Sequence, residues 1–178
     1  MGGIPRAGAC RARGAGHRAA SVARCGTSRL LEELPGVEHR LSRTERQALQ
    51  AIAAGARTPL EAFLATQDLE EAPFLGDAWF YRVLSTLGQG DARLLESDEG
   101  EPLPAPPPLS DGRGFVRLRL RLTETGERVL RREADRVDLL GVDRWLGGTH
   151  VTPESGWRWD SAAPRGQSVT TTSCKCTL

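Results

Sequence analysis

The residues best suited to chemistry in this chain lie near its C-terminal end. Asp143, His150 and Asp160 place one imidazole close in sequence to two carboxylates, and such a histidine could act as a general base. Gly147 and Gly148 could let a substrate approach the backbone closely, or they could simply form a tight turn in a structural cap. The sequence has no nucleophile motif, no phosphate-binding glycine loop and no metal-ligand spacing. We therefore predict that the protein is not an enzyme and needs no cofactor.

Tryptophan is the second informative residue type in this region. Aromatic residues make up only 5% of the chain, yet three of its four tryptophans follow residue 144. Tryptophan fills cores, and it is also enriched at the energetic centres of protein interfaces. We predict that this Trp-rich segment forms a contact surface for another protein or for a companion domain. The residues of that predicted surface are Asp143, Arg144, Trp145, His150, Trp157 and Trp159.

Three helices that could support this segment are predicted from capping residues and apolar spacing. The first, over 42–55, begins at a capping box formed by Ser42 and Glu45. The second, over 58–68, begins with a Thr-Pro pair, and the third covers 77–87. The side chains expected to be buried are Leu60, Phe63 and Leu64 in the second helix, and Trp79, Phe80, Val83, Leu84 and Leu87 in the third.

The apolar period then changes to that of strands. Residues 93–96 form a short candidate strand, and residues 97–114 form a long loop rich in Pro and Gly. Apolar residues alternate with arginine through 115–122, which is typical of a half-buried strand, and a fourth helix is expected over 123–137. This order, together with the Leu-Thr-Glu-Thr-Gly phrase at 122–126, resembles a winged helix-turn-helix domain. The predicted fold is therefore mainly α with a small β-hairpin, of winged helix-turn-helix-like type.

A fold of this type makes a DNA-binding regulator the alternative function. The helix over 77–87 would enter the major groove, and arginines of the wing would touch phosphates. Residues 37–160 contain 16 arginines and 21 acidic residues, a net charge of −5, whereas DNA-binding domains are usually basic. This charge favours a protein partner over DNA. The candidate DNA contacts are Tyr81, Arg82 and Ser85 on the helix, and Arg117, Arg119 and Arg121 on the wing.

The two ends of the chain differ in composition from its centre. Residues 1–28 are rich in Gly, Ala and Arg and contain no acid, and residues 161–178 are polar. Segments that bury so little apolar surface cannot offset their ordering entropy, so we predict disorder at both ends and a folded domain over 29–160. No apolar run approaches the roughly 18 residues that span a bilayer, and we expect a cytoplasmic location without membrane contact. The four cysteines lie in the two ends and lack metal-binding spacing, so we expect no metal site: Cys10, Cys25, Cys174 and Cys176.

Four phrases of the sequence carry a resemblance to a known family. They are Leu-Ser-Arg-Thr-Glu-Arg-Gln at 41–47, Glu-Glu-Ala-Pro-Phe-Leu-Gly-Asp at 70–77, Gly-Val-Asp-Arg-Trp-Leu-Gly-Gly-Thr-His at 141–150 and Trp-Arg-Trp-Asp at 157–160. Across residues 30–160 the chain resembles the C-terminal half of an uncharacterised bacterial family, domain-of-unknown-function family 1835. The resemblance implies an additional N-terminal domain where this chain has its Arg-rich segment, so we expect a truncated or mis-started chain. It implies no catalytic residues.

Overall fold

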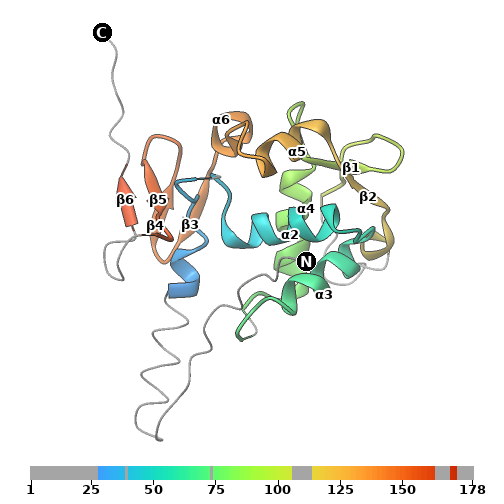
Figure 1. Cartoon of the computed structure of the whole chain (residues 1–178), viewed down its shortest axis with the longest axis horizontal. Coiled ribbons are helices and arrows are strands. Elements are labelled where there is room, and N and C mark those ends of the chain that lie inside the picture. The colour runs from blue at the N-terminus through green and yellow to red at the C-terminus, as the bar shows by residue number, and fades with distance from the viewer. Residues whose placement is uncertain (1–27, 39, 73, 106–113, 163–168, 172–178) are drawn as a thin grey trace, which may run out of the picture.

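The computed structural model describes residues 28–38, 40–72, 74–105, 114–162 and 169–171. This part of the chain is mainly helical with short antiparallel strand pairs, so the predicted fold class is confirmed at that level (Figure 1). The β part is larger than the single predicted hairpin, since the described strands form three pairs. Most of the predicted disorder, over 1–27, 163–168 and 172–178, lies outside the described residues.

Helix α2 (Arg43–Ala53) begins as its capping box predicts. The Glu45 amide donates to the Ser42 hydroxyl at 3.2 Å, and the Ser42 amide donates to the Glu45 carboxylate at 2.8 Å. These two bonds satisfy amides that the first helical turn otherwise leaves without partners. The apolar face of α2 contributes Ala48, Leu49 and Ile52 to the main core.

Helix α3 (Pro59–Gln67) starts at Thr58 as predicted, but it buries a different face. Leu60 and Leu64 are 44% and 55% exposed, whereas Ala62 is fully buried and Phe63 is partly buried. The expected burial of Leu60 and Leu64 is therefore wrong. The helix packs against α2 and α4 through the side that carries small Ala62, which allows the helices to approach closely.

Helix α4 (Asp77–Leu87) buries Phe80, Leu84 and Leu87 as predicted, and it buries Val83 in part. Trp79 is 57% exposed, so its predicted place in the core is wrong. The reason is that segments distant in sequence cover another side of this helix, which leaves the Trp79 side open.

Strand β1 (Leu95–Ser97) pairs antiparallel with β2 (Leu120–Leu122), with Leu95 opposite Leu122. The predicted strand over 115–122 is therefore too long, because its first residues form the 3₁₀ helix η1 (Phe115–Arg117). Phe115 turns inward and packs against the Tyr81 ring of α4, with 5.6 Å between ring centroids. The apolar and arginine side chains still lie on opposite sides of β2, since Leu120 is buried and Arg121 is exposed.

The single helix predicted over 123–137 is wrong, because it is split into α5 (Glu124–Leu130) and α6 (Arg136–Leu140). Thr123 caps α5 as predicted. Helix α5 ends at Leu130, and a new helix begins at Asp135, whose carboxylate accepts from the Val137 amide at 2.7 Å and so caps α6. The turn between the two helices places Arg132 at φ +64°.

The closing segment consists of two strand pairs, β3 (Arg144–Leu146) with β4 (Thr149–Val151) and β5 (Trp157–Trp159) with β6 (Val169–Thr171). Strand β6 lies in the C-terminal segment that was predicted to be irregular. The closing segment adds a second, smaller core formed by Leu34, Val137, Val142 and Val151.

Residues 28–38 connect the closing segment to the helices. The Val37 amide donates to the Trp159 carbonyl at 3.0 Å, and the Trp159 amide donates to the Pro35 carbonyl at 2.9 Å. Figure 1 shows this N-terminal segment between α2 and the closing strands. None of the helices in the described part of the chain is both long enough and apolar enough to cross a bilayer.

Candidate functional site

The β3–β4 hairpin presents the most exposed large aromatic residue in the described part of the chain. Gly147 and Gly148 form its two-residue turn with φ of 55° and 83°, and a turn with two positive φ angles matches the twist of a hairpin. The resulting register places Trp145 directly opposite His150. Trp145 is 70% exposed. The predicted tight turn thus positions an aromatic side chain toward solvent.

Three predicted contact residues meet on this outward face. The rings of Trp145 and His150 stack with 4.8 Å between centroids and 6° between planes. His150 Nε2 lies 2.7 Å from Asp143 Oδ1. Asp143 and Trp145 are two residues apart along one strand edge, so they share a face of the hairpin. We call Asp143, Trp145 and His150 the hairpin face.

The other three predicted contact residues lie elsewhere. Arg144 turns to the inner side of the hairpin, where it donates to the Glu33 carbonyl. Trp157 and Trp159 are partly buried against the second core. Of the six residues of the predicted surface, the exposed ones are therefore Asp143, Trp145 and His150.

The hairpin face contains the His–Asp pair that is typical of a general base, but it lacks an environment that excludes water. Asp143 and His150 lie within hydrogen-bond distance, yet their side chains are 84% and 43% exposed to water. Asp160, the second candidate carboxylate, instead accepts from the Ala162 amide at 2.8 Å. Base catalysis is strongest where water is excluded and a reacting group is held in place. Among the described residues, no group of three or more His, Cys, Asp or Glu could hold a metal ion.

The predicted DNA-reading residues do not form one surface. Tyr81 and Ser85 are 8% and 1% exposed, so neither side chain lies on the surface where the predicted contact with base edges would be made. Phe115 covers Tyr81, and the Ser85 hydroxyl donates to the Pro104 carbonyl at 2.8 Å. Of the three predicted residues on α4, only Arg82 is exposed.

The predicted wing arginines are exposed but mostly paired with acids of the same hairpin. Arg121 lies 2.8 Å from Glu96, and Arg119 lies 3.6 Å from Asp98. Arg117 is exposed in η1 rather than in the wing strand. These pairs reduce the positive charge that a phosphate backbone would meet.

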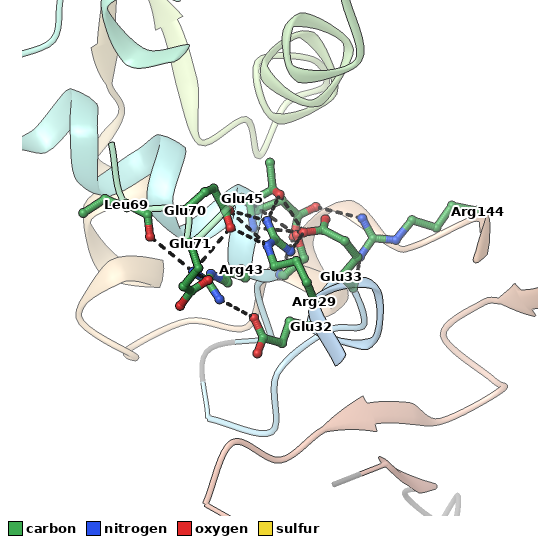
Figure 2. A network of polar contacts seen from close by, with 11 residues as sticks. Arg29, Glu32, Glu33, Arg43, Glu45, Leu69, Glu70, Glu71 and Arg144 are labelled. Atoms are coloured by element: carbon green, nitrogen blue, oxygen red, sulfur yellow. Dashed lines mark hydrogen bonds and ion pairs between the residues drawn. The ribbon is translucent and has the colours of Figure 1, made fainter. Parts of the chain in front are cut away.

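A buried ionic network lies between the N-terminal segment and the helices (Figure 2). Arg29 contacts Glu33 at 2.6 Å and Glu70 at 2.7 Å, and its guanidinium also donates to the Thr44 hydroxyl at 2.9 Å. Its guanidinium carbon lies 4.1 Å from the centroid of the Phe74 ring. Arg29 therefore forms an ion pair with a residue 41 positions later in the chain. Sequence reasoning missed this network, and only the i, i+4 spacing of Arg29 and Glu33 hinted at it.

Glu45 extends the ionic contacts to the closing segment. Its Oε1 atom lies 3.0 Å from Arg136 of α6 and 3.7 Å from Arg144 of β3. Burial alone would raise the pKa of Glu45, but the two arginines and the Ser42 amide hold the pKa below its ordinary value. Glu45 therefore stays ionised inside the protein and fixes the inner side of the hairpin whose outer side carries Trp145.

An open groove of about 870 Å³ lies beside this network. One wall is α2, with Arg43, Arg46 and Gln50. Residues from the segments 32–38 and 68–71 form the other walls. Leu34, Leu41 and Trp159 also line the groove. Sequence reasoning did not predict this groove, because its walls come from separate parts of the chain.

Comparison of the chain with models of known families, with curated proteins and with solved structures finds no match. The resemblance to domain-of-unknown-function family 1835 therefore stays a prediction.

Proposed function

We propose that this protein is a non-catalytic interaction module of winged-helix type that contacts a partner protein through the hairpin face. The observation that carries the proposal is the 70% exposure of Trp145 on the β3–β4 hairpin. A side chain of this size in water is unfavourable unless a partner covers it, because burying it contributes roughly 1.5–3 kcal/mol.

The geometry favours binding because Trp145 is held in one orientation. The His150 stack contributes about 0.5–1.5 kcal/mol beyond buried area, and Asp143 fixes the His150 ring. A side chain that is already ordered loses less entropy when a partner binds. Tryptophan in such a position is a typical interface hot spot.

The winged-helix type is supported by the order of elements. Helices α2, α3 and α4 are followed by the antiparallel pair β1–β2, which is the arrangement of a three-helix body with a wing. The burial of Tyr81 and Ser85 and the pairing of Arg119 and Arg121 favour a protein partner over the alternative, DNA.

The test is affinity capture from an extract of the source cells with the full chain as bait. We expect a partner that binds wild-type protein and is lost with Trp145→Ala, since truncating a hot-spot residue costs about 2 kcal/mol or more, roughly a 30-fold loss of affinity. Trp79→Ala is the matched control, because Trp79 is also exposed but lies on α4. Far-ultraviolet circular dichroism verifies that both variants are folded.

His150→Ala separates orientation from contact. It leaves the indole in place but removes the ring stacked on it, so we expect weaker binding than wild type and stronger binding than Trp145→Ala. A folded Trp145→Ala variant that binds every partner of the wild type equally well would overturn the proposal. Equal losses for Trp79→Ala and Trp145→Ala would also count against it.

A further inference from the structure

The open groove beside the ionic network has an excess of negative charge. Five carboxylates and two guanidinium groups line it. The carboxylates belong to Glu32, Glu38, Asp68, Glu70 and Glu71, and the cations are Arg43 and Arg46.

Part of this negative charge is free to meet a ligand. Glu70 pairs with Arg29 at 2.7 Å and its side chain is only 6% exposed, and Glu38 pairs with Arg132 at 3.1 Å. Arg43 already pairs with one carboxylate oxygen of Glu32 at 2.7 Å and with one carboxylate oxygen of Glu71 at 3.1 Å. Asp68 is exposed, and within the described part of the chain its carboxylate has no hydrogen-bond or ion-pair partner. The Asp68–Glu71 wall therefore offers carboxylate oxygens toward solvent.

The chain itself carries a segment of the opposite charge. Residues 1–27 contain five arginines and no acidic residue, with Gly and Ala as the commonest residues. The segment joins the described part of the chain next to the groove, because the amide of Glu32, a lining residue, donates to the Ser28 carbonyl at 3.2 Å. Arg18 is ten residues before Ser28, and ten extended residues reach at most about 33–36 Å.

We propose that the groove is the docking site of the chain's own Arg-rich segment, residues 1–27. Guanidinium groups of the segment pair with the carboxylates of Asp68 and Glu71, and its small residues pass over the partly exposed side chain of Trp159. Covalent attachment favours this occupant over a separate basic protein, since a short flexible link gives an effective concentration in the millimolar range.

The test is paramagnetic broadening in nuclear magnetic resonance spectra of the full chain. A nitroxide is attached to Cys10 after Cys25, Cys174 and Cys176 are replaced by Ser. We expect the amide signals of Gln50 and Leu69 to lose most of their intensity. The Asp98 amide should keep its intensity, because the β1–β2 pair lies at the end of the described molecule that is away from the closing strands (Figure 1).

Two pairs of variants show whether charge complementarity causes the broadening. Replacing Arg11, Arg13 and Arg18 with Ser should restore the Gln50 and Leu69 signals, as should combining Asp68→Asn with Glu71→Gln. The matched control combines Asp91→Asn with Glu99→Gln, which removes the same charge outside the groove and should leave the broadening unchanged. Raising the ionic strength to about 1 M, where the Debye length is about 3 Å, should weaken the broadening.

Three results would overturn the proposal. The first is intact Gln50 and Leu69 signals in the labelled wild-type chain. The second is equal broadening after the three arginines are replaced, because tethering alone would then explain it. The third is broadening that occurs only between molecules, detected by mixing nitroxide-labelled chains with unlabelled ¹⁵N chains, which would assign the groove to a second copy.

Discussion

Glu45 holds three parts of the fold together, and its charge can be removed with almost no change of shape. Glu45→Gln keeps the volume of the side chain and one acceptor oxygen. It removes the negative charge that faces Arg136, whose side chain is 6% exposed. Breaking one partner of a buried ion pair costs about 3–5 kcal/mol, because the remaining charge is left without compensation.

This loss should be measurable as a lower melting temperature. One kcal/mol corresponds to about 2–4 °C for a domain of 150–250 residues, so we expect a decrease of about 6–20 °C in thermal unfolding followed by circular dichroism. Glu127→Gln is the matched control, because Glu127 pairs with Arg131 at 3.2 Å while both side chains are half exposed. Exposed pairs contribute little to stability, and this control should melt like wild type.

The pH dependence gives a second measure of the same effect. The folded pKa of Glu45 lies below its unfolded value, so its contribution is complete above about pH 4.3, the pKa of a glutamate in an unfolded chain. The contribution is lost as the pH falls through the folded pKa. The stability difference between wild type and Glu45→Gln should therefore shrink on acidification. Equal melting temperatures of Glu45→Gln and Glu127→Gln at neutral pH would refute this account of Glu45.

Two further substitutions test the packing. Arg158 is 6% exposed, and its side chain donates one described hydrogen bond, to the Trp157 carbonyl at 2.9 Å. Burial lowers the pKa of Arg158, and repulsion from Arg40 lowers it as well. Arg158→Met should therefore match wild type in urea unfolding or exceed it by up to about 4 kcal/mol, and a loss of more than about 1 kcal/mol would show that the charge stabilises the fold. In Gly126→Ala, the new Cβ would come 2.2 Å from the Leu94 carbonyl oxygen, and we expect a loss of about 1–3 kcal/mol or more. Gly114→Ala has nothing within 4 Å of its Cβ and should cost much less in the same urea titration; similar losses in both variants would contradict the packing argument.

The features that depend only on neighbouring residues could be predicted from the amino-acid sequence. Ser42 with Glu45, Thr58 and Thr123 start their helices as predicted, because a cap is completed within about four residues. The Gly147–Gly148 turn is formed for the same reason, since its positive φ angles are local. The Asp135 cap is equally local, but the helical spacing of the apolar residues around it concealed the break between α5 and α6.

Which helix faces are covered depends on long-range packing. Leu60 and Trp79 have apolar side chains at helical spacing yet face solvent, whereas Tyr81 and Ser85 are covered by residues more than 15 positions away. No local pattern contains that information, because burial depends on which distant segment packs against a helix.

The same reason applies to the site. The sequence singled out Asp143, Trp145 and His150, but their shared face depends on strand pairing, and the inward position of Arg144 depends on Glu45, 99 residues earlier in the chain. Charges and aromatic residues can be read from the sequence. Whether they face a partner, a core or one another is fixed only when long-range packing brings their segments together.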